Sequence, residues 1–379
     1  MPPVKLRRAV TALAAAGLLT GSLAGAALAE PAGGAPGAVV GNTELPAELW
    51  LDGTGSARRL TYWTRTSLDE PALSTGAIFV PAGTPPPGGW PVLSWEHGTV
   101  GVADECAPSV AGRSDRDKNY LSTWLKQGYA VVATDYIGLG TPGVHTYLDG
   151  RAEAHAGIDM VRAARAVDPT LAAKWMAIGQ SQGGGAAVFT AAMATRYAPE
   201  LDYRGAVATG PASNVVEAAS LIGPQTPPIP SSHLTAYAAY IMVGLKAARP
   251  AFDADAYLTP IGKEVVTAAE QMCLTAQAAE KFGSITVNQL FSQPLSSGPF
   301  AEYAHEVMDV PLTGYDRPLF LGQGTNDTDV FLPLTLKLIA DLETHGVRPE
   351  VHIYPGLDHS ATVAGSLPDS MPFVARAFS

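Results

Sequence analysis

Residues 175–187 read WMAIGQSQGGGAA and carry the clearest signal of the fold class. It begins as a short apolar run typical of a buried strand and continues into an Ala-rich segment that predicts a helix over residues 184–197. Ser181 lies between them at the centre of G-x-S-x-G. In a sharp strand-to-helix turn the serine hydroxyl is exposed, the glycines avoid clashes, and the positive end of the helix faces the serine. Ser181 is therefore a candidate nucleophile; the plainer alternative is a Gly/Ser helix cap.

Predicted strands and helices alternate on both sides of this stretch. The strands cover residues 59–65, 76–80, 92–95, 130–134, 175–178, 205–209, 319–322 and 350–354, and the helices cover residues 151–167, 184–197, 334–345 and 371–378. The run AVVAT at 130–134 is apolar along its length, as in a parallel strand covered on both faces. This alternation predicts an α/β protein with a mostly parallel sheet and helices on both faces.

The alternation is interrupted in residues 212–312. Helical patches at 234–248 and 262–282 are separated there by Pro-rich turns. We therefore predict that this segment is a helical cap. It would be inserted into a core formed by residues 30–211 and 313–379.

The first 29 residues have the pattern of a secretory signal peptide. Three basic residues precede an apolar run rich in Ala, Leu and Gly, and Ala-Leu-Ala at 27–29 is a suitable cleavage site. A transmembrane anchor is the alternative, but the run is rich in small residues and a Pro/Gly-rich segment follows at once. We predict a secreted protein cleaved near Ala29, in which residues 30–57 form a tail and approach to the core.

Composition and charge exclude several classes of function. The chain has 379 residues, 47% of them hydrophobic and 16% charged, and its formal net charge is −11. Cleavage of the signal peptide would remove three positive charges and no negative ones, which changes −11 to −14. An acidic chain lacks the basic footprint that nucleic acids require. No second apolar run of about 20 residues occurs, so no membrane span is expected.

A serine nucleophile needs a base and a carboxylate that orients the base. In the α/β-hydrolase class these follow the serine in the order Asp or Glu, then His. Of the five histidines downstream of Ser181, His359 lies in a loop directly after a predicted strand, and such loops meet at the carboxyl edge of a sheet. Asp327 follows the strand at 319–322. We predict the triad Ser181, Asp327 and His359, with Asp329 as the rival acid.

Acyl transfer also needs hydrogen-bond donors for the oxygen that becomes negative. One should be the backbone N–H of Gln182, the residue after the nucleophile. The other should come from the loop after an early strand, where the sequence reads WEHGT and a glycine permits close backbone approach. We predict Thr99, with Gly98 and Val100 as alternatives. His97 is expected to fix this loop.

The sequence gives no support for a cofactor or a metal. Residues 138–143, GLGTPG, match the G-x-G-x-x-G pattern, but a dinucleotide loop opens a helix at once. Here Pro142 intervenes, and the next predicted helix begins at residue 151. No CxxC and no HExxH occurs, so no zinc site is predicted. We expect residues 138–143 to flank the active-site cleft.

Six motifs together resemble the secretory lipase family, an α/β-hydrolase group with a helical cap. In chain order they are SWEHGT at 94–99, CAPS at 106–109, DYIGLG at 135–140, GQSQG at 179–183, QGTND at 323–327 and DHS at 358–360. Singly they are modest signals, but in this order they are specific. The resemblance covers most of the chain after the signal peptide.

The resemblance implies lipase or carboxylesterase activity, no cofactor, the triad named above and a cap that shapes the acyl pocket. It also implies a disulfide from core to cap, which Cys106 and Cys273 match. An even pair of distant cysteines in an oxidising compartment suggests the same bond. One departure is the segment TDVFLP after Asp327, which is longer than the usual short Val-Pro ending and keeps Asp329 as an alternative.

We expect a secreted serine hydrolase that cleaves carboxylic esters through an acyl-enzyme. A serine peptidase or amidase with the same triad is the first alternative, and a non-catalytic binding protein on this fold is the second. The expected partner is a small-molecule or lipid ester, with transient contact with a lipid interface, no nucleic acid and no obligate protein partner. The apolar residues of 234–245 suit lipid-like acyl groups, although a packed helix face explains them equally.

Overall fold

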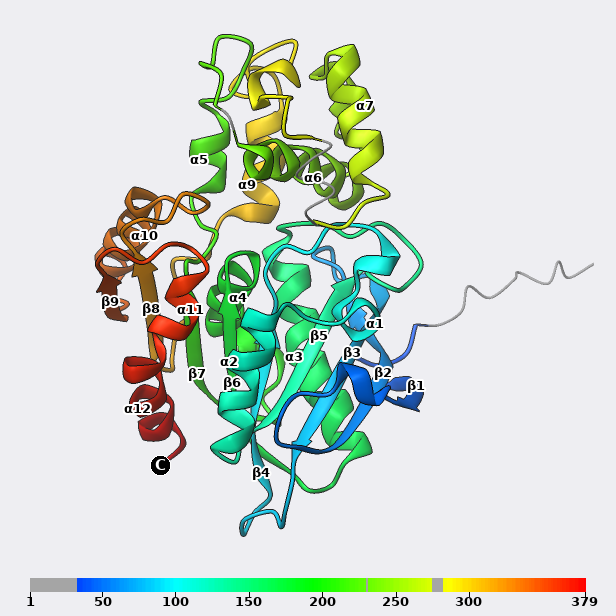
Figure 1. Cartoon of the computed structure of the whole chain (residues 1–379), viewed down its shortest axis with the longest axis vertical. Coiled ribbons are helices and arrows are strands. Elements are labelled where there is room, and N and C mark those ends of the chain that lie inside the picture. The colour runs from blue at the N-terminus through cyan, green and yellow to red at the C-terminus, as the bar shows by residue number, and fades with distance from the viewer. Residues whose placement is uncertain (1–32, 230, 275–281) are drawn as a thin grey trace, which may run out of the picture. The chain divides into compact units, whose positions relative to one another are not determined.

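A nine-stranded sheet forms the centre of the computed structural model, which describes residues 33–229, 231–274 and 282–379 (Figure 1). The strands are β1 (Val39–Glu44), β2 (Thr54–Arg65), β3 (Pro71–Pro81), β4 (Trp90–Glu96), β5 (Ala130–Ile137), β6 (Leu171–Gln180), β7 (Asp202–Thr209), β8 (Leu319–Gly324) and β9 (Glu350–Tyr354). Their order is β1-β2-β3-β5-β4-β6-β7-β8-β9. The pairings from β1 to β5 are antiparallel and those from β5 to β9 are parallel, which confirms the predicted mostly parallel sheet.

Strand β5 shows why the central strands are apolar along their length. Val131 and Ala133 pack into the hydrophobic cluster on one face of the sheet, and Ala130 and Val132 pack into the cluster on the other face. Successive side chains of a strand point to opposite faces. A strand covered on both faces therefore needs an apolar residue at nearly every position.

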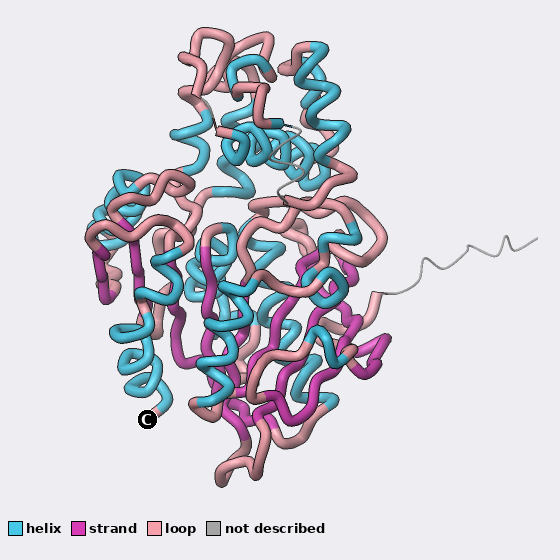
Figure 2. The backbone as a smooth tube through the Cα atoms, in the orientation of Figure 1, coloured by secondary structure: helices cyan, strands magenta, loops and turns pink. Residues whose placement is uncertain are grey.

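Helices flank the sheet on both faces (Figure 2). One face is covered by α3 (Gly150–Val167), α4 (Gln182–Tyr197) and α10 (Leu332–Thr344), and the other by α2 (Asp115–Lys126), α11 (Ala361–Gly365) and α12 (Leu367–Phe378). The short α1 (Pro108–Ala111) precedes α2. Most predicted elements are present with longer bounds, because the apolar pattern marks only the buried centre of each element.

Three predictions differ from the structure. Residues 30–57 contain β1 and the start of β2, whereas only a tail was predicted; β1 is an edge strand with mostly exposed side chains, so it lacks an apolar pattern. Helix α2 was not predicted, although Ser114 caps it by accepting a hydrogen bond from the Asp117 N–H. The helix predicted over 262–282 is represented by α7 (Pro260–Ala269), and residues 275–281 lie outside the described residues.

The segment between β7 and β8 contains α5 (Val215–Ala219), α6 (Ser232–Ala248), α7 and α9 (Phe300–Met308). These helices lie together beyond the carboxyl ends of the parallel strands (Figure 1). They have a hydrophobic cluster of their own, whose large buried members include Tyr240, Met242, Phe252, Phe291 and Phe300. This cluster explains how the predicted cap segment packs without adding a strand to the sheet.

A disulfide joins this segment to the core, as predicted. Cys106 at the end of η2 (Asp104–Cys106) is bonded to Cys273, with the two Cα atoms 5.3 Å apart. Beside the bond, the Leu274 N–H donates to the Val100 carbonyl oxygen at 2.7 Å, and Gly101 forms a β-bridge with Cys273. The core and the cap segment are thus tied together at this point by both covalent and hydrogen bonds.

The predicted signal peptide, residues 1–29, lies outside the described residues. Among the helices that the structure does describe, none combines the length and the apolar character needed to cross a membrane.

Candidate active site

Ser181 occupies a sharp turn between β6 and α4. Its backbone φ is +61°, a region that L residues rarely adopt, and its N–H donates to the Thr209 carbonyl oxygen at 3.0 Å. A Cβ at Gly179 would lie 2.0 Å from the carbonyl oxygen of Gly183. A Cβ at Gly183 would lie 1.8 Å from the carbonyl oxygen of Glu96. Both positions therefore require glycine, and the structure places Ser181 where the sequence predicted it.

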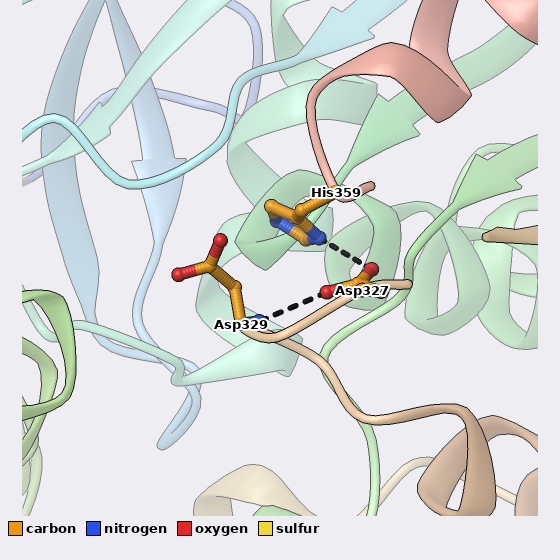
Figure 3. Close-up of side chains that lie close together, drawn as sticks. All are labelled: Asp327, Asp329 and His359. Atoms are coloured by element: carbon orange, nitrogen blue, oxygen red, sulfur yellow. Dashed lines mark hydrogen bonds and ion pairs between the residues drawn. The ribbon is translucent and has the colours of Figure 1, made fainter. Parts of the chain in front are cut away.

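His359 and Asp327 lie together, as Figure 3 shows. His359 follows β9, Asp327 follows β8, and His359 Nδ1 lies 2.7 Å from Asp327 Oδ2. The carboxylate also accepts hydrogen bonds from the Gln323 side chain and from the N–H groups of Asp329 and Val330. A carboxylate held by four donors has a fixed orientation. Because it accepts from Nδ1–H, the lone pair of the imidazole lies on Nε2.

Ser181 and His359 border the same cavity. Both are largely buried, at 9% and 7% exposure. His359 Nε2 forms no hydrogen bond with any residue that the structure describes. Among the described residues this nitrogen is bonded to none, Ser181 included, and catalytic hydrogen bonds often tighten only when substrate is bound.

Asp329, the rival acid, has a different environment. Its backbone N–H donates to Asp327 (Figure 3). Its carboxylate accepts hydrogen bonds from Tyr237 Oη at 3.2 Å and His233 Nδ1 at 3.3 Å. Both partners are on α6. Asp329 thus joins the loop after β8 to the cap segment, and the structure records no hydrogen bond between its carboxylate and His359.

The two predicted oxyanion donors lie near Ser181. Gln182 is the first residue of α4, and Thr99 borders the same two cavities as Ser181. A Cβ at Gly98 would lie 3.4 Å from the Ser181 Cβ, so this loop passes close to the serine, as a backbone donor would require. The His97 ring contacts the carbonyl oxygens of Gly98 at 2.7 Å and Asp135 at 3.3 Å, which agrees with the expected loop-fixing role.

A buried polar network under Gln182 was not predicted. The Gln182 side-chain amide donates to Glu153 Oε1 at 2.7 Å and lies 2.9 Å from His145 Nε2. His145 Nδ1 contacts the Ile137 carbonyl oxygen, so Nε2 is the accepting nitrogen. Glu153 also accepts from the Leu148 N–H. The signal that could have revealed it is a glutamate within the apolar stretch of the helix at 151–167.

Burial shifts the protonation of this network. It raises the pKa of the Glu153 carboxyl to about 8 and lowers the pKa of the His145 imidazole to about 3. It also raises the pKa of Glu96, whose Oε1 accepts from the Thr190 hydroxyl, well above its usual value. Glu153 and His145 are therefore both neutral at pH 7, so Gln182 is held by groups that carry no net charge.

One group of side chains has the composition of a metal site. Ligand atoms of Asp327, Asp329 and His359 lie within 4.8 Å of one another, and among the described residues no other cluster of three such groups is found. However, Asp327 and His359 already bond each other, and Asp329 bonds two residues of α6. The arrangement is satisfied by hydrogen bonds alone.

The loop at 138–143, which matches the G-x-G-x-x-G pattern, does not lead directly into a helix, since α3 begins at Gly150.

Two cavities meet at Ser181. The first, of about 440 Å³, is mainly apolar and runs under the cap segment. The second, of about 490 Å³, has both polar and apolar groups in its lining and runs over α1 and the start of α2. Ser181, Thr99, Tyr237 and Asp329 border both. The serine thus stands at the junction of two compartments of different chemistry.

The family model of the secretory lipases matches residues 111–293. The chain matches the secretory lipase family. The matched range includes Ser181 and most of the cap segment, and it ends before Asp327 and His359. The resemblance predicted from the six motifs is confirmed. The family's description also implies an extracellular protein.

One curated relative of this chain is Lipase A of Moesziomyces aphidis. The two are 26% identical over 186 residues, which cover 45% of this chain and 38% of the relative. The match therefore spans well under half the length of that protein.

Solved structures similar to this chain include two enzymes. Candida antarctica lipase A has a TM-score of 0.72 at 20% identity, with 91% of this chain and 82% of that chain covered. The rice cell wall degrading esterase LipA of Xanthomonas oryzae has a TM-score of 0.71 at 20% identity, with 90% and 97% covered. At this identity the likeness shows the fold, which is that of an α/β hydrolase.

Proposed function

We propose that the chain is a secreted serine hydrolase that cleaves carboxylic esters through an acyl-enzyme. The observation that carries the proposal is the convergence of three strand-end loops. One presents Ser181 on a strained turn, and the other two bring the His359 imidazole within 2.7 Å of the Asp327 carboxylate. The names of the similar proteins, lipases and an esterase, favour esters among the possible acyl substrates.

In the proposed reaction His359 Nε2 takes the proton of the Ser181 hydroxyl while Oγ attacks the ester carbonyl carbon. The carbonyl oxygen becomes negative and is stabilised by the N–H groups of Gln182 and Thr99. The bond from the carbonyl carbon to the alcohol oxygen then breaks, and Nε2–H protonates that oxygen. A water molecule repeats the sequence on the acyl-enzyme and releases the acid. Asp327 orients the imidazole and stabilises its protonated form.

The proposal also covers where the protein acts and which molecules it contacts. We infer cleavage of the signal peptide near Ala29, a small-molecule or lipid ester as substrate, and transient contact with a lipid interface. Exposed apolar side chains at the rim of the apolar cavity, Leu221, Ile229 and Phe331, support that contact.

A fluorophosphonate probe tests the proposal. It should label the folded wild-type protein at Ser181 and should not label Ser181→Ala, and this variant should lose on the order of 10⁴-fold or more in kcat with an unchanged circular dichroism spectrum. Absence of label on folded wild type would leave only a binding role. Faster turnover of aminoacyl anilides than of p-nitrophenyl esters would instead identify a peptidase or amidase.

A further inference from the structure

The loop at 138–148 lies between β5 and α3 and carries the G-x-G-x-x-G pattern, which the proposed function does not use. This loop turns back on itself: at Gly138, where φ is +76°, a Cβ would lie 2.4 Å from the backbone nitrogen of His145. A side chain there would force the two limbs of the loop apart, so the position requires glycine. The pattern therefore serves a tight return of the chain, and the returning limb carries His145 and Tyr147.

His145 holds the side chain of Gln182. Its Nδ1 lies 2.9 Å from the Ile137 carbonyl oxygen and its ring stacks on that of Tyr136, which leaves Nε2 to accept from the Gln182 amide at 2.9 Å. Both His145 and Gln182 are buried. Gln182 follows the strained turn at Ser181, and a strained backbone persists only where its surroundings hold it in place. Anchoring the Gln182 side chain therefore fixes the direction of its backbone N–H.

Tyr147 holds Thr99, the residue with the second proposed oxyanion donor. The Tyr147 Oη lies 2.7 Å from the Thr99 Oγ1. Residues 97–100 belong to neither a helix nor a strand, and the Thr99 N–H forms no hydrogen bond with any described residue. Such an N–H is available to a negative oxygen, but the irregular backbone needs another group to fix its direction. The bond between the two hydroxyl groups supplies that restraint.

Tyr147 is itself held tightly between the core and the cap segment. Its ring packs edge-on against Tyr240 of α6, with the ring centroids 5.8 Å apart. A Cβ at Gly244, one turn further along α6, would lie 2.5 Å from the Tyr147 backbone nitrogen. On the core side, the next residue, Leu148, donates its N–H to Glu153. The ring is only 4% exposed, so its hydroxyl group has a fixed position against Thr99.

We propose that the loop at 138–148 is the positioning element of the oxyanion site, in which His145 directs the N–H of Gln182 and Tyr147 directs the N–H of Thr99. This inference rests on the proposed function, in which the carbonyl oxygen becomes negative at these two N–H groups. His145 and Tyr147 act through the donor residues. Donors stabilise such an oxygen only when they are held in place before the reaction, and a displacement of about 1 Å costs about 10²-fold in rate.

A pair of ketones tests the proposal. In 1,1,1-trifluorodecan-2-one the carbonyl carbon is activated: Ser181 Oγ bonds to it, the hydroxyl proton moves to His359, and the ketone oxygen becomes an anion at the two N–H groups. Decan-2-one has the same chain without the activation, so it reports binding of the chain alone. We expect Tyr147→Phe and His145→Leu to weaken inhibition by the fluorinated ketone about tenfold and to leave inhibition by decan-2-one unchanged. Equal losses for both ketones, or no loss for either, would overturn the proposal.

Double variants show whether each residue acts through the donor assigned to it. Thr99→Val and Tyr147→Phe should each lower kcat for p-nitrophenyl butanoate about tenfold, and the double variant should lose no more than the worse single variant. Thr99→Ser retains the hydroxyl group and should retain kcat. His145→Leu should likewise cause no further loss in a Gln182→Met background. Losses that multiply in both double variants would show that the residues act independently and would contradict the assignment.

Tyr315→Phe is the matched control. It removes a hydroxyl group that donates to the Pro311 carbonyl oxygen at 2.6 Å, and Tyr315 borders neither cavity at Ser181, so kcat and both inhibition constants should stay unchanged. Melting temperatures show that each variant is folded. If the wild type hydrolyses the ester and the loop variants match it, this proposal alone is wrong. A folded wild type that neither hydrolyses the ester nor binds the fluorinated ketone would overturn the proposed function as well.

Discussion

The core and the cap segment contribute to the site in different ways. The three residues of the proposed triad follow core strands, Ser181 after β6, Asp327 after β8 and His359 after β9. The described part of the cap contributes mainly walls, most of them apolar side chains of α5 and α6. A strand end fixes a side chain because hydrogen bonds to the adjacent strand hold its backbone, whereas a helical wall can change its side chains and keep its fold. Changes in the core should therefore alter the rate for every ester, and changes in the cap should alter which esters react.

The two neighbouring aspartates give the largest expected contrast. Asp327→Asn should lower kcat by about 10⁴-fold, because the amide no longer orients the imidazole or stabilises its protonated form. Asp329→Asn should lower it only severalfold, since Asp329 bonds Tyr237 and His233 of the cap. Steady-state kinetics of both variants, with melting temperatures to check folding, measure the contrast. A larger loss in Asp329→Asn would make that residue the triad acid.

The network under Gln182 predicts a pH effect that originates in the core. Burial raises the pKa of Glu153 to about 8, so its carboxyl is neutral below that pH and becomes an anion beneath a proposed oxyanion donor above it. An anion there opposes the negative oxygen, and kcat of the wild type should fall about tenfold or more between pH 8 and pH 9.5. Glu153→Gln keeps an acceptor for Gln182 and should retain its activity over this range.

The free energy of unfolding should also depend on the protonation of Glu153. The folded pKa of Glu153 is raised above its unfolded value, so the unfolded state binds fewer protons between about pH 4.5 and 8, and the wild type loses stability as pH rises through that window. Glu153→Gln should not show this loss in urea unfolding. If the wild type and Glu153→Gln showed the same pH dependence of activity and of stability, neither effect could be assigned to Glu153.

A substitution in the cap should change chain-length selectivity. Leu234→Trp fills part of the apolar cavity and should lower kcat/KM for a dodecanoyl ester about fivefold, with little change for a butanoyl ester. Leu336→Trp is the control, because Leu336 is exposed on α10 and does not line the cavity. If both variants reacted alike with both esters, the cap would not select the acyl chain.

The disulfide should affect stability more than chemistry. A bond that closes a loop of 167 residues contributes about 2–5 kcal/mol by restricting the unfolded chain. The Cys106→Ala, Cys273→Ala double variant should unfold at lower urea concentration and keep most of its activity at 25 °C. An unchanged midpoint would show that the bond does not stabilise the protein.

Much of this arrangement could be predicted from the sequence, because the decisive signals are local. The turn at Ser181 is encoded by its own glycines, and His359 by the strand before it. The local sequence does not separate Asp327 from Asp329 as the triad acid, because both residues follow β8. Only tertiary contacts distinguish them: the Asp327 carboxylate bonds His359, and the Asp329 carboxylate bonds α6. The network around Glu153 was not predicted for the same reason. Its members Gln182 and His145 are distant from Glu153 or carry no motif that links them to it.

The bond between Cys106 and Cys273 constrains how the enzyme could admit a bulky molecule. The cap segment is continuous with the core at both of its ends, and the bridge beside Val100 adds a third anchor. A body fixed at three points cannot swing as a rigid flap, so entry of a bulky molecule requires local displacements within the cap segment. Leu221, which is 77% exposed and borders the apolar cavity, is a side chain that can move in this way while the three anchors stay in place.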